Sequence, residues 1–340
     1  MITYRDNSTI PYQDWVHLRI NSIGASEIGA VVYGNKWTSN LEIFYEKIGR
    51  PRKDVNNIRA FLGKETEDVS AKCWSYYDGY NDNSVVENVR NGKKLKDCLN
   101  LNFTATNSLY PHLSCTPDRE IQPFGVYDGR GKGSLEIKNT NTYVLNSYES
   151  GLPTDNVVQL IAQLMICEYD YGELFYFIDN ARFKNYPHER KLSSNIEEII
   201  LAHTVPFWEN ILKARPLFNQ LYEANRNHNM RLVNELQKEI ARLEPPPQNT
   251  AGYEMFLTER YKDRLNGAGI IAGKDTDLII ARKHKELAKQ LDEIEAQKRL
   301  CEIELKRIIG DNSGIDFGKN GKVTWFVDKQ GKRKFINKTK

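Results

Sequence analysis

Two short segments carry acidic and basic side chains whose spacing suits a metal-dependent hydrolase. Asp118 ends the apolar segment 113–118, and Glu136 and Lys138 follow after a short glycine-rich connection. Side chains alternate between the two faces of a strand, so Glu136 and Lys138 share one face while Ile137 points the other way. If the two segments pair as strands, Asp118 meets the face that carries Glu136 and Lys138.

These groups suit the hydrolysis of a phosphodiester. The carboxylates of Asp118 and Glu136 can hold Mg²⁺, which prefers oxygen ligands, and Mn²⁺ can take its place. A divalent cation lowers the pKa of a bound water and stabilises the charge that develops on phosphorus. Lys138 can orient the attacking water or help to deprotonate it. A plainer interpretation stays open, because a Glu-x-Lys triplet is usually a solvated strand face and Pro-Asp is usually a turn.

Size and composition indicate a globular protein with more than one part. The 340 residues exceed one average domain, and 40% of them are hydrophobic. No apolar run approaches the roughly 20 residues that span a bilayer, and the N-terminal residues lack the apolar segment of a secretion signal. The five cysteines are scattered without a Cys-x-x-Cys pair. We therefore expect a reduced cytoplasmic protein without zinc or an iron–sulfur cluster.

Charge is distributed unevenly along the chain. The net charge is +3, but residues 319–340 contain eight Lys/Arg and one Asp, which is +7 for this tail and −4 for the rest. The body is therefore not a basic DNA-coating protein. The tail can contact phosphates nonspecifically, or it can simply favour solubility.

The pattern of apolar residues predicts helices alternating with short strands over the first 190 residues. Helices are expected at 13–32 with a turn at 22–24, and at 38–48, 58–77 and 157–167. Strands are expected at 84–90, 101–108, 113–116, 134–137 and 174–178. This order predicts an α/β fold with a mixed β-sheet core flanked by helices.

A helical extension follows this core. Ser194 and Glu197 form a capping-box pattern that opens a long helical stretch, with an interruption at Pro216, up to residue 243. The segment 280–308 has a coiled-coil-like apolar seam, and we expect an intramolecular helical hairpin rather than a subunit zipper because two seam positions are polar. A terminal β-hairpin is expected at 322–336. The predicted domains are a nuclease core at 1–225 and a helical, coiled-coil-like extension with a basic hairpin at 226–340.

Five motifs in one order resemble a known family, the phage-type recombination exonucleases. This is the lambda exonuclease or YqaJ-like branch of the PD-(D/E)XK nucleases, which have a restriction-endonuclease-like fold. The motifs are Trp15-x-x-Leu18-Arg19 with Ile23-x-Ala25-Ser26-Glu27, Gly63-x-x-x-Glu67, Pro117-Asp118, Glu136-Ile137-Lys138, and Gln159-x-x-x-Gln163-Leu164. The gap between Asp118 and Glu136 is longer than the compact family pattern, and the resemblance does not extend with comparable specificity to residues 252–340.

The resemblance implies a role for each matching residue. Asp118, Glu136 and the Ile137 carbonyl would bind the metal, and Glu67 would complete a second metal site or orient the nucleophilic water. Lys138 would serve the nucleophile, with Gln159 beside it. The terminal 5′-phosphate would be held by Arg19 and Ser26. A helix N-terminus after Gly24 and the planar guanidinium of Arg19 both suit an anion.

The leading hypothesis is a Mg²⁺-dependent double-strand DNA exonuclease with two-metal-type hydrolysis. It would resect one strand 5′ to 3′ and leave a 3′ single strand for an annealing partner in phage-type recombination, as a homo-oligomer. The alternative is a structure-specific or restriction-type endonuclease on the same fold. A third hypothesis is a catalytically inactive DNA-binding scaffold. No membrane association is expected.

Overall fold

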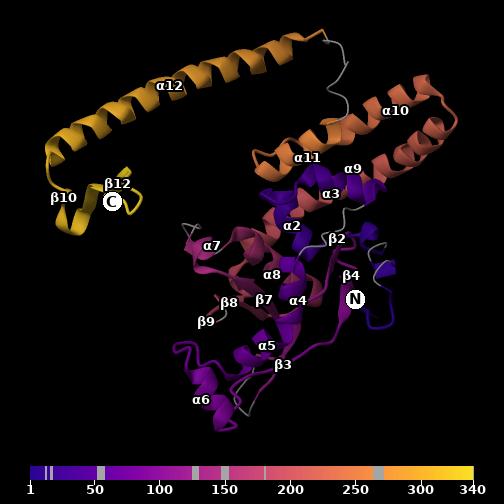
Figure 1. The fold of residues 1–340 in the computed structure, drawn as a ribbon. Coiled ribbons are helices and arrows are strands. Elements are labelled where there is room, and N and C mark those ends of the chain that lie inside the picture. The colour runs from indigo at the N-terminus through magenta and orange to yellow at the C-terminus, as the bar shows by residue number, and fades with distance from the viewer. Residues whose placement is uncertain are drawn as a thin grey trace. The chain divides into compact units, whose positions relative to one another are not determined.

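The computed structural model describes residues 1–11, 14–15, 18–51, 58–124, 130–146, 153–179, 181–262 and 272–339. It divides into two compact units, Met1–Asp263 and Arg264–Lys340, which are coloured along the chain in Figure 1. The glycine-rich connection between Asp118 and Glu136 lies partly outside the described residues, as do two residues of the Trp15–Arg19 motif.

Two mixed sheets form the framework of the first unit. The larger sheet has the order β3-β6-β7-β8-β9, and β7 pairs with β8 in parallel while its other pairings are antiparallel. Its strands are β3 Asp97–Leu99, β6 Arg119–Gln122, β7 Gly133–Thr140, β8 Tyr171–Ile178 and β9 Arg182–Glu189. The smaller sheet has the order β1-β4-β5-β2. Its strands are β1 Ile2–Asp6, β4 Phe103–Asn107, β5 Leu113–Cys115 and β2 Ile23–Gly24.

Helix α8, Thr154–Cys167, lies between β7 and β8 in the chain and packs against both sheets. Its apolar side chains pack on two sides. Leu160 packs with side chains of β8, and Ile161 and Leu164 belong to the main core. Gly172 on β8 permits this close approach, since a Cβ there would lie 2.9 Å from Leu160 Cδ1 and 2.7 Å from the Ser134 carbonyl oxygen. The parallel β7–α8–β8 arrangement positions the predicted active-site segments side by side.

The first unit contains further helices, some on its sheets and some on other helices (Figure 1). They are α2 Ala25–Val32, α3 Asn40–Ile48, α4 Ile58–Glu65, α5 Glu67–Tyr76, α6 Ser84–Arg90, α7 Thr142–Asn146, α9 Ser194–Arg226, α10 Met230–Leu243 and α11 Ala251–Tyr261, with the 3₁₀ turns η1 Arg19–Asn21 and η2 Arg190–Leu192. Helices α9 and α10 form a hairpin, and α11 packs on α3. The functional division expected at residue 226 stays a prediction, but α10 and α11 belong to the first compact unit.

Several local predictions were wrong. Residues 84–90 form α6 instead of a strand, because Val85 is buried against Trp74 and Tyr77 and this packing overrides the β-propensity of valine. The turn expected at 22–24 contains the short strand β2. The capping box at Ser194 does not form, because Glu197 binds Arg190 at 2.8 Å.

Two predictions about where helices are interrupted were also wrong. Helix α9 continues through Pro216. The single helix expected at 58–77 is broken at Thr66, whose hydroxyl donates to the Leu62 carbonyl at 2.7 Å, and α5 starts anew at Glu67.

The second unit contains one long helix and a small sheet. Helix α12 spans Asp275–Ile309, and β10 Gly314–Asp316, β11 Gly321–Val327 and β12 Arg333–Thr339 form an antiparallel sheet. The helix and the terminal hairpin were predicted. On α12 the seam residues Ile280, Leu287 and Ile294 are 69%, 52% and 60% exposed, and the expected intramolecular pairing of the seam stays a prediction.

The protein has the predicted α/β fold, with mixed sheets flanked by helices, a C-terminal helix and terminal strands. Among the helices in the described ranges, none is both long and apolar enough to cross a membrane.

Candidate active site

Asp118 lies where the chain passes from the smaller sheet to the larger one. The segment 113–118 was expected to pair with the strand that carries Glu136, but β5 ends at Cys115 and pairs with β4 and β2. The next strand, β6, pairs with β7 in the register Arg119↔Leu135. The pairing of β6 with β7 therefore brings Asp118, the residue before β6, close to Glu136. The Oδ2 atom of Asp118 accepts a hydrogen bond from the Ile137 N–H at 2.7 Å.

Glu136 is the centre of a network of hydrogen bonds. It is 2% exposed, and its Oε1 atom accepts from Gln159 Nε2 at 2.6 Å and pairs with Lys138 Nζ at 2.6 Å. Its Oε2 atom accepts from Gln163 Nε2 at 2.6 Å. Ser134 donates its hydroxyl to Gln163 Oε1 at 2.6 Å, which fixes the orientation of that amide. Two glutamines one turn apart on α8 therefore hold both oxygens of one carboxylate.

Lys138 and Ile137 have the strand alternation that the sequence predicts. The Ile137 side chain packs with Leu135 and Phe175 in the core. On the other face Lys138 Nζ donates to Gln159 Oε1 at 3.0 Å and pairs with Glu136. Burial alone would lower the pKa of Lys138, but the charges of Glu136 and Asp118 raise it above its ordinary value. Lys138 is therefore an ammonium ion in this arrangement.

The acidic groups are crowded and have little solvent. Burial raises the pKa of Asp118 to about 7, and the neighbouring Glu67 carboxylate adds to the shift while Lys138 opposes it. Burial and the charge of Asp118 raise the pKa of Glu136 to about 7 as well. Asp118 and Glu136 thus share one lysine, and Glu67 adds a third negative charge beside Asp118.

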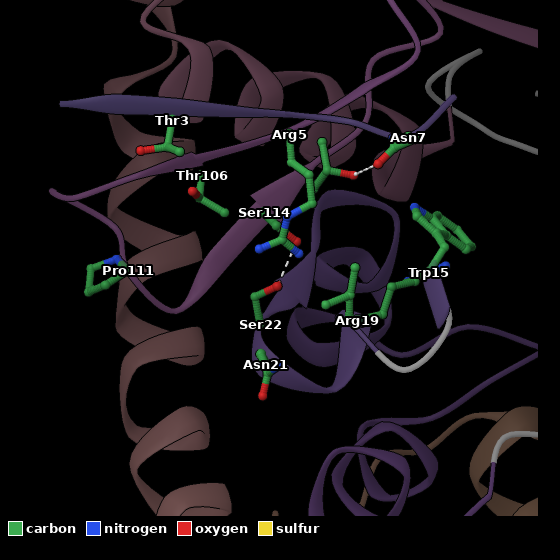
Figure 2. A pocket seen from close by; sticks show the side chains of 12 residues that line it. Thr3, Arg5, Asn7, Trp15, Arg19, Asn21, Ser22, Thr106, Pro111 and Ser114 are labelled. Carbon is green, nitrogen blue, oxygen red and sulfur yellow. Dashed lines mark hydrogen bonds between the residues drawn. The ribbon is translucent and has the colours of Figure 1, made fainter. Parts of the chain in front are cut away.

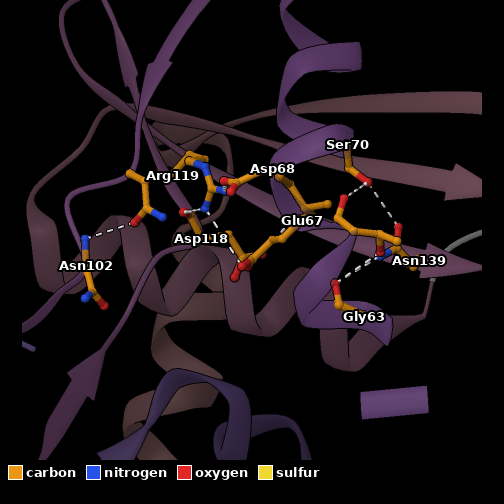
Figure 3. Close-up of polar contacts among 11 residues, drawn as sticks. Gly63, Glu67, Asp68, Ser70, Asn102, Asp118, Arg119 and Asn139 are labelled. Carbon is orange, nitrogen blue, oxygen red and sulfur yellow. Dashed lines mark hydrogen bonds and ion pairs between the residues drawn. The ribbon is translucent and has the colours of Figure 1, made fainter. Parts of the chain in front are cut away.

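Glu67 reaches this cluster because the helix break at Thr66 makes it the first residue of α5. It lies 3.9 Å from Arg119 Nη1, and Arg119 also pairs with Asp68 (Figure 3). Asn139, which follows Lys138 on β7, fixes the break. Its Nδ2 donates to the Gly63 carbonyl at 3.2 Å and to the Thr66 hydroxyl (Figure 3).

The donor set fits a hard divalent cation. Burial and a neighbouring negative charge raise the pKa of both Asp118 and Glu136, so a cation that neutralises them stabilises the cluster, and Mg²⁺ prefers such oxygens. Asp118 and Glu136 provide the central pair, and Glu67 lies beside Asp118. In the part of the chain that the structure describes, no three His, Cys, Asp or Glu side chains already converge in a ready-made metal cage. The match is thus one of chemistry and charge.

Arg19 and Ser26 lie next to each other, as the two predicted phosphate ligands must. Arg19 Nη2 is 3.4 Å from Ser26 Oγ, and it also pairs with Glu27 Oε1 at 2.9 Å. Lys47 pairs with Glu27 Oε2 at 2.7 Å. Although burial opposes it, these two cations hold the pKa of Glu27 below its ordinary value. The Arg19 guanidinium stacks 5.0 Å above the Trp15 ring. Arg19 is thus held in place by a salt bridge.

A small pocket of about 140 Å³, with polar and apolar residues in its lining, adjoins Arg19 (Figure 2). Arg5 of β1 contributes a second guanidinium to its lining, and several hydroxyl groups surround it. Among these, Ser22 Oγ donates to Ser114 Oγ at 2.7 Å. The pocket therefore offers two cations and multiple hydrogen-bonding groups beside the Arg19–Ser26 pair.

Sequence reasoning overlooked three residues of this region. Gln163 could have been found, because its spacing from Gln159 puts both amides on one face of α8. Asn139 and Arg5 gave no signal, because their neighbours belong to segments far away in the chain. Each of the residues assigned from the sequence, on the other hand, lies in one of two groups: Glu67, Asp118, Glu136, Ile137, Lys138 and Gln159 in the first, and Arg19 and Ser26 in the second.

Comparisons with known proteins agree with these motifs. Residues 14–170 match the family model of the YqaJ-like viral recombinase domain. The chain is 21% identical over 312 residues to an uncharacterized protein, YqaJ, of Bacillus subtilis (strain 168), a match that covers 90% of this chain and 80% of that protein.

Two solved structures of one enzyme are also similar. The alkaline exonuclease LHK-Exo of Laribacter hongkongensis is 17% identical, with a TM-score of 0.42, over 62% of this chain and 99% of that chain. Its complex with dAMP is 16% identical, with a TM-score of 0.41, over 64% of this chain and 99% of that chain.

Proposed function

We propose that this protein is a Mg²⁺-dependent double-strand DNA exonuclease, and the match of residues 14–170 to the YqaJ-like viral recombinase domain supports this proposal. It degrades one strand 5′ to 3′ and leaves a 3′ single strand for an annealing protein in phage-type recombination. The observation that carries the proposal is the buried cluster of Asp118, Glu136 and Lys138, in which two carboxylates share one ammonium group.

In this proposal Asp118, Glu136, Glu67 and the Ile137 carbonyl hold the metal ions of a two-metal-type hydrolysis. When bound, Mg²⁺ supplies an activated water and neutralises the charge that develops on the phosphate. Mn²⁺ has the same preference for oxygen ligands and substitutes for it. Gln159 and Gln163 hold the Glu136 carboxylate in a single orientation, which would preorganise it as a ligand.

Lys138 acts as a proton-bearing group in this mechanism. Its raised pKa argues against deprotonation of the water and supports a role as donor. The ammonium orients the attacking water or a phosphate oxygen and stabilises the charge that develops there. Gln159 Oε1 accepts a hydrogen bond from Lys138 Nζ and helps to fix the position of the ammonium group.

The pair Arg19 and Ser26 gives the proposed enzyme its preference for ends. A charge-assisted contact from the guanidinium to a terminal 5′-phosphate is stronger than the neutral bond available to a 5′-hydroxyl. The adjoining pocket, with Arg5, supports this role because it extends the polar surface around Arg19. The enzyme functions in the cytoplasm of a bacterial or phage-infected cell as a homo-oligomer, with residues 1–225 as its nuclease core and 226–340 as an extension.

The decisive experiment incubates linear and circular duplex DNA with the protein and sizes the products over time. Linear substrates carry either a 5′-phosphate or a 5′-hydroxyl, and reactions contain Mg²⁺, Mn²⁺, Ca²⁺ or EDTA. We expect mononucleotides and 3′ single strands from 5′-phosphorylated linear DNA in Mg²⁺ or Mn²⁺ only. Cleavage of closed circular DNA would indicate the endonuclease alternative, and activity in EDTA would exclude the metal site.

A further inference from the structure

The small sheet of the second unit has one face covered by its own helix. The cross-strand pair Trp325 and Phe335 lies on this face, and Lys306 of α12 is 5.6 Å and 5.4 Å from their ring centroids. Val323 on the same face and Ile309 at the end of α12 are each 1% exposed. This face is therefore the hydrophobic core of the second unit.

The opposite face is open to solvent and combines lysines with apolar side chains. The register pairs Lys322 with Lys338, Thr324 with Ile336, and Phe326 with Lys334. Side chains paired across strands point to the same face, so these residues form one surface, which we term the lysine face. Phe326 and Ile336 are 38% and 36% exposed at its centre.

The charge around the lysine face is predominantly positive. Residues 319–340 contain eight Lys/Arg and one Asp, a net charge of +7. Two carboxylates lie close to the face: Asp316 is paired across strands with Lys322, and Asp328 binds Lys334 at 3.0 Å. Within the described ranges Lys322 and Lys338 form no ion pair closer than 4 Å, so their ammonium groups are available to an anion.

We propose that the lysine face binds a single strand of nucleic acid, which would be the 3′ strand released by the nuclease if the proposed function holds. Lysines attract backbone phosphates, and an exposed aromatic ring stacks with an unpaired base irrespective of its identity. A duplex keeps its bases paired and could use only the lysines. The exposed Phe326, which is paired across strands with Lys334, therefore favours the single strand.

The test measures binding without digestion. The full-length Asp118→Asn variant in EDTA is titrated into a fluorescein-labelled single-stranded oligonucleotide, and separately into a duplex of equal length, over a range of salt concentrations. The face variants are Phe326→Ala and the pair Lys322→Gln with Lys338→Gln. The matched control is the pair Lys329→Gln with Lys332→Gln, which removes the same charge from the β11–β12 turn.

We expect Phe326→Ala to weaken single-strand binding about 5- to 100-fold and to leave duplex binding unchanged. The Lys322/Lys338 pair should weaken single-strand binding at least tenfold and flatten the log–log salt slope by about 1.4, because each phosphate contact on a single strand contributes about 0.7. Equal losses in the turn control would show that net charge alone matters. Unchanged affinity in both face variants would also overturn the proposal.

This readout is separate from the nuclease proposal. A protein that binds single strands through Phe326 but hydrolyses no DNA would refute the proposed function and keep the lysine face. A protein that resects DNA, and whose face variants bind single strands as tightly as the wild type, would support the proposed function and refute binding by the lysine face. Circular dichroism of Phe326→Ala controls for folding, since a side chain 38% exposed contributes little to the core.

Discussion

Gln163 donates from Nε2 to Glu136 Oε2 at 2.6 Å, and Ser134 donates to the other end of the same amide at 2.6 Å. Since the Ser134 hydroxyl donates to Gln163 Oε1, the amide NH₂ must face the carboxylate. The Glu136 carboxylate is therefore oriented by Gln163, a buried residue of α8. The sequence motif that contains Gln163 does not by itself assign this residue a role.

Replacing this amide should reduce activity without touching a metal ligand. Gln163→Leu leaves a buried carboxylate oxygen without its donor, which costs about 1–3 kcal/mol in unfolding free energy. We expect turnover to fall about 10- to 100-fold, because a positioned ligand becomes free to rotate. Turnover and urea denaturation measure the two effects. Met165→Leu on the same buried helix is the control, and an equal loss there would assign the effect to packing.

Removing either central carboxylate should abolish hydrolysis while keeping the fold. Asp118→Asn and Glu136→Gln each eliminate an oxygen anion that the metal requires. Exonuclease assays in Mg²⁺ should show no product above background, and melting temperatures should not fall. Asp292→Asn on the exposed surface of α12 is the matched control. Near wild-type turnover in the Asp118 variant would refute the assignment of the active centre.

Stability without metal should decrease as the pH rises. Burial, aided by the charge of Glu67 at Asp118 and by the charge of Asp118 at Glu136, raises the pKa of both groups to about 7 in the folded state, above the roughly 4 of an unfolded chain. The folded state therefore binds more protons between these values, and the free energy of unfolding falls from about pH 4 to pH 7.

Thermal denaturation in EDTA between pH 5 and 8 checks this decrease. Saturating Mg²⁺ should reduce it, since the cation replaces the protons as counter-charge. The double variant Asp118→Asn, Glu136→Gln is the comparison, because it lacks both titrating groups. If the slope is equal in the wild type and in the double variant, the pH dependence does not come from these two carboxylates.

Arg19→Ala should selectively reduce the use of phosphorylated ends. A charge-assisted bond is worth roughly 1.5–3 kcal/mol, so the preference for a 5′-phosphate over a 5′-hydroxyl should shrink about ten- to hundredfold. The two substrates are compared in the same variant, which removes any general effect of losing the Glu27 salt bridge. Arg231→Ala, on an exposed part of α10, controls for the loss of a positive charge. Equal losses on both kinds of end would make Arg19 a structural residue.

The exposed seam of α12 should join subunits. Leu287 and Ile294 are more than half exposed and lie one heptad apart. Substituting both by Asp should lower the molar mass measured by light scattering, because charges cannot be buried in such a seam. Lys285→Asp, on the same helix but outside the seam, should leave the mass unchanged. An unchanged mass in the double variant would exclude α12 as a subunit zipper.

Much of the site could be predicted from the sequence because it depends on local periodicity. The alternation of Glu136, Ile137 and Lys138 follows from strand geometry, and the spacing of Gln159 and Gln163 follows from a helical turn. The route of the chain through Asp118 could not be predicted. Strand β6 is only four residues long, Arg119–Gln122, and it forms because β3 and β7 lie on either side.

The position of α6 and the state of the α12 seam also depended on distant partners. Val85 has the β-propensity of a strand residue, and only the packing of Trp74 and Tyr77 decides for a helix. For Ile280 and Leu287 the sequence shows an apolar seam but does not say which chain covers it.

Asp118 has a further consequence that concerns mechanics. Its backbone belongs to the joint between the two sheets, while its carboxylate is tied to the Ile137 N–H at 2.7 Å. A rotation of the smaller sheet against the larger one at this joint would therefore act on the hydrogen bond between Asp118 and Ile137.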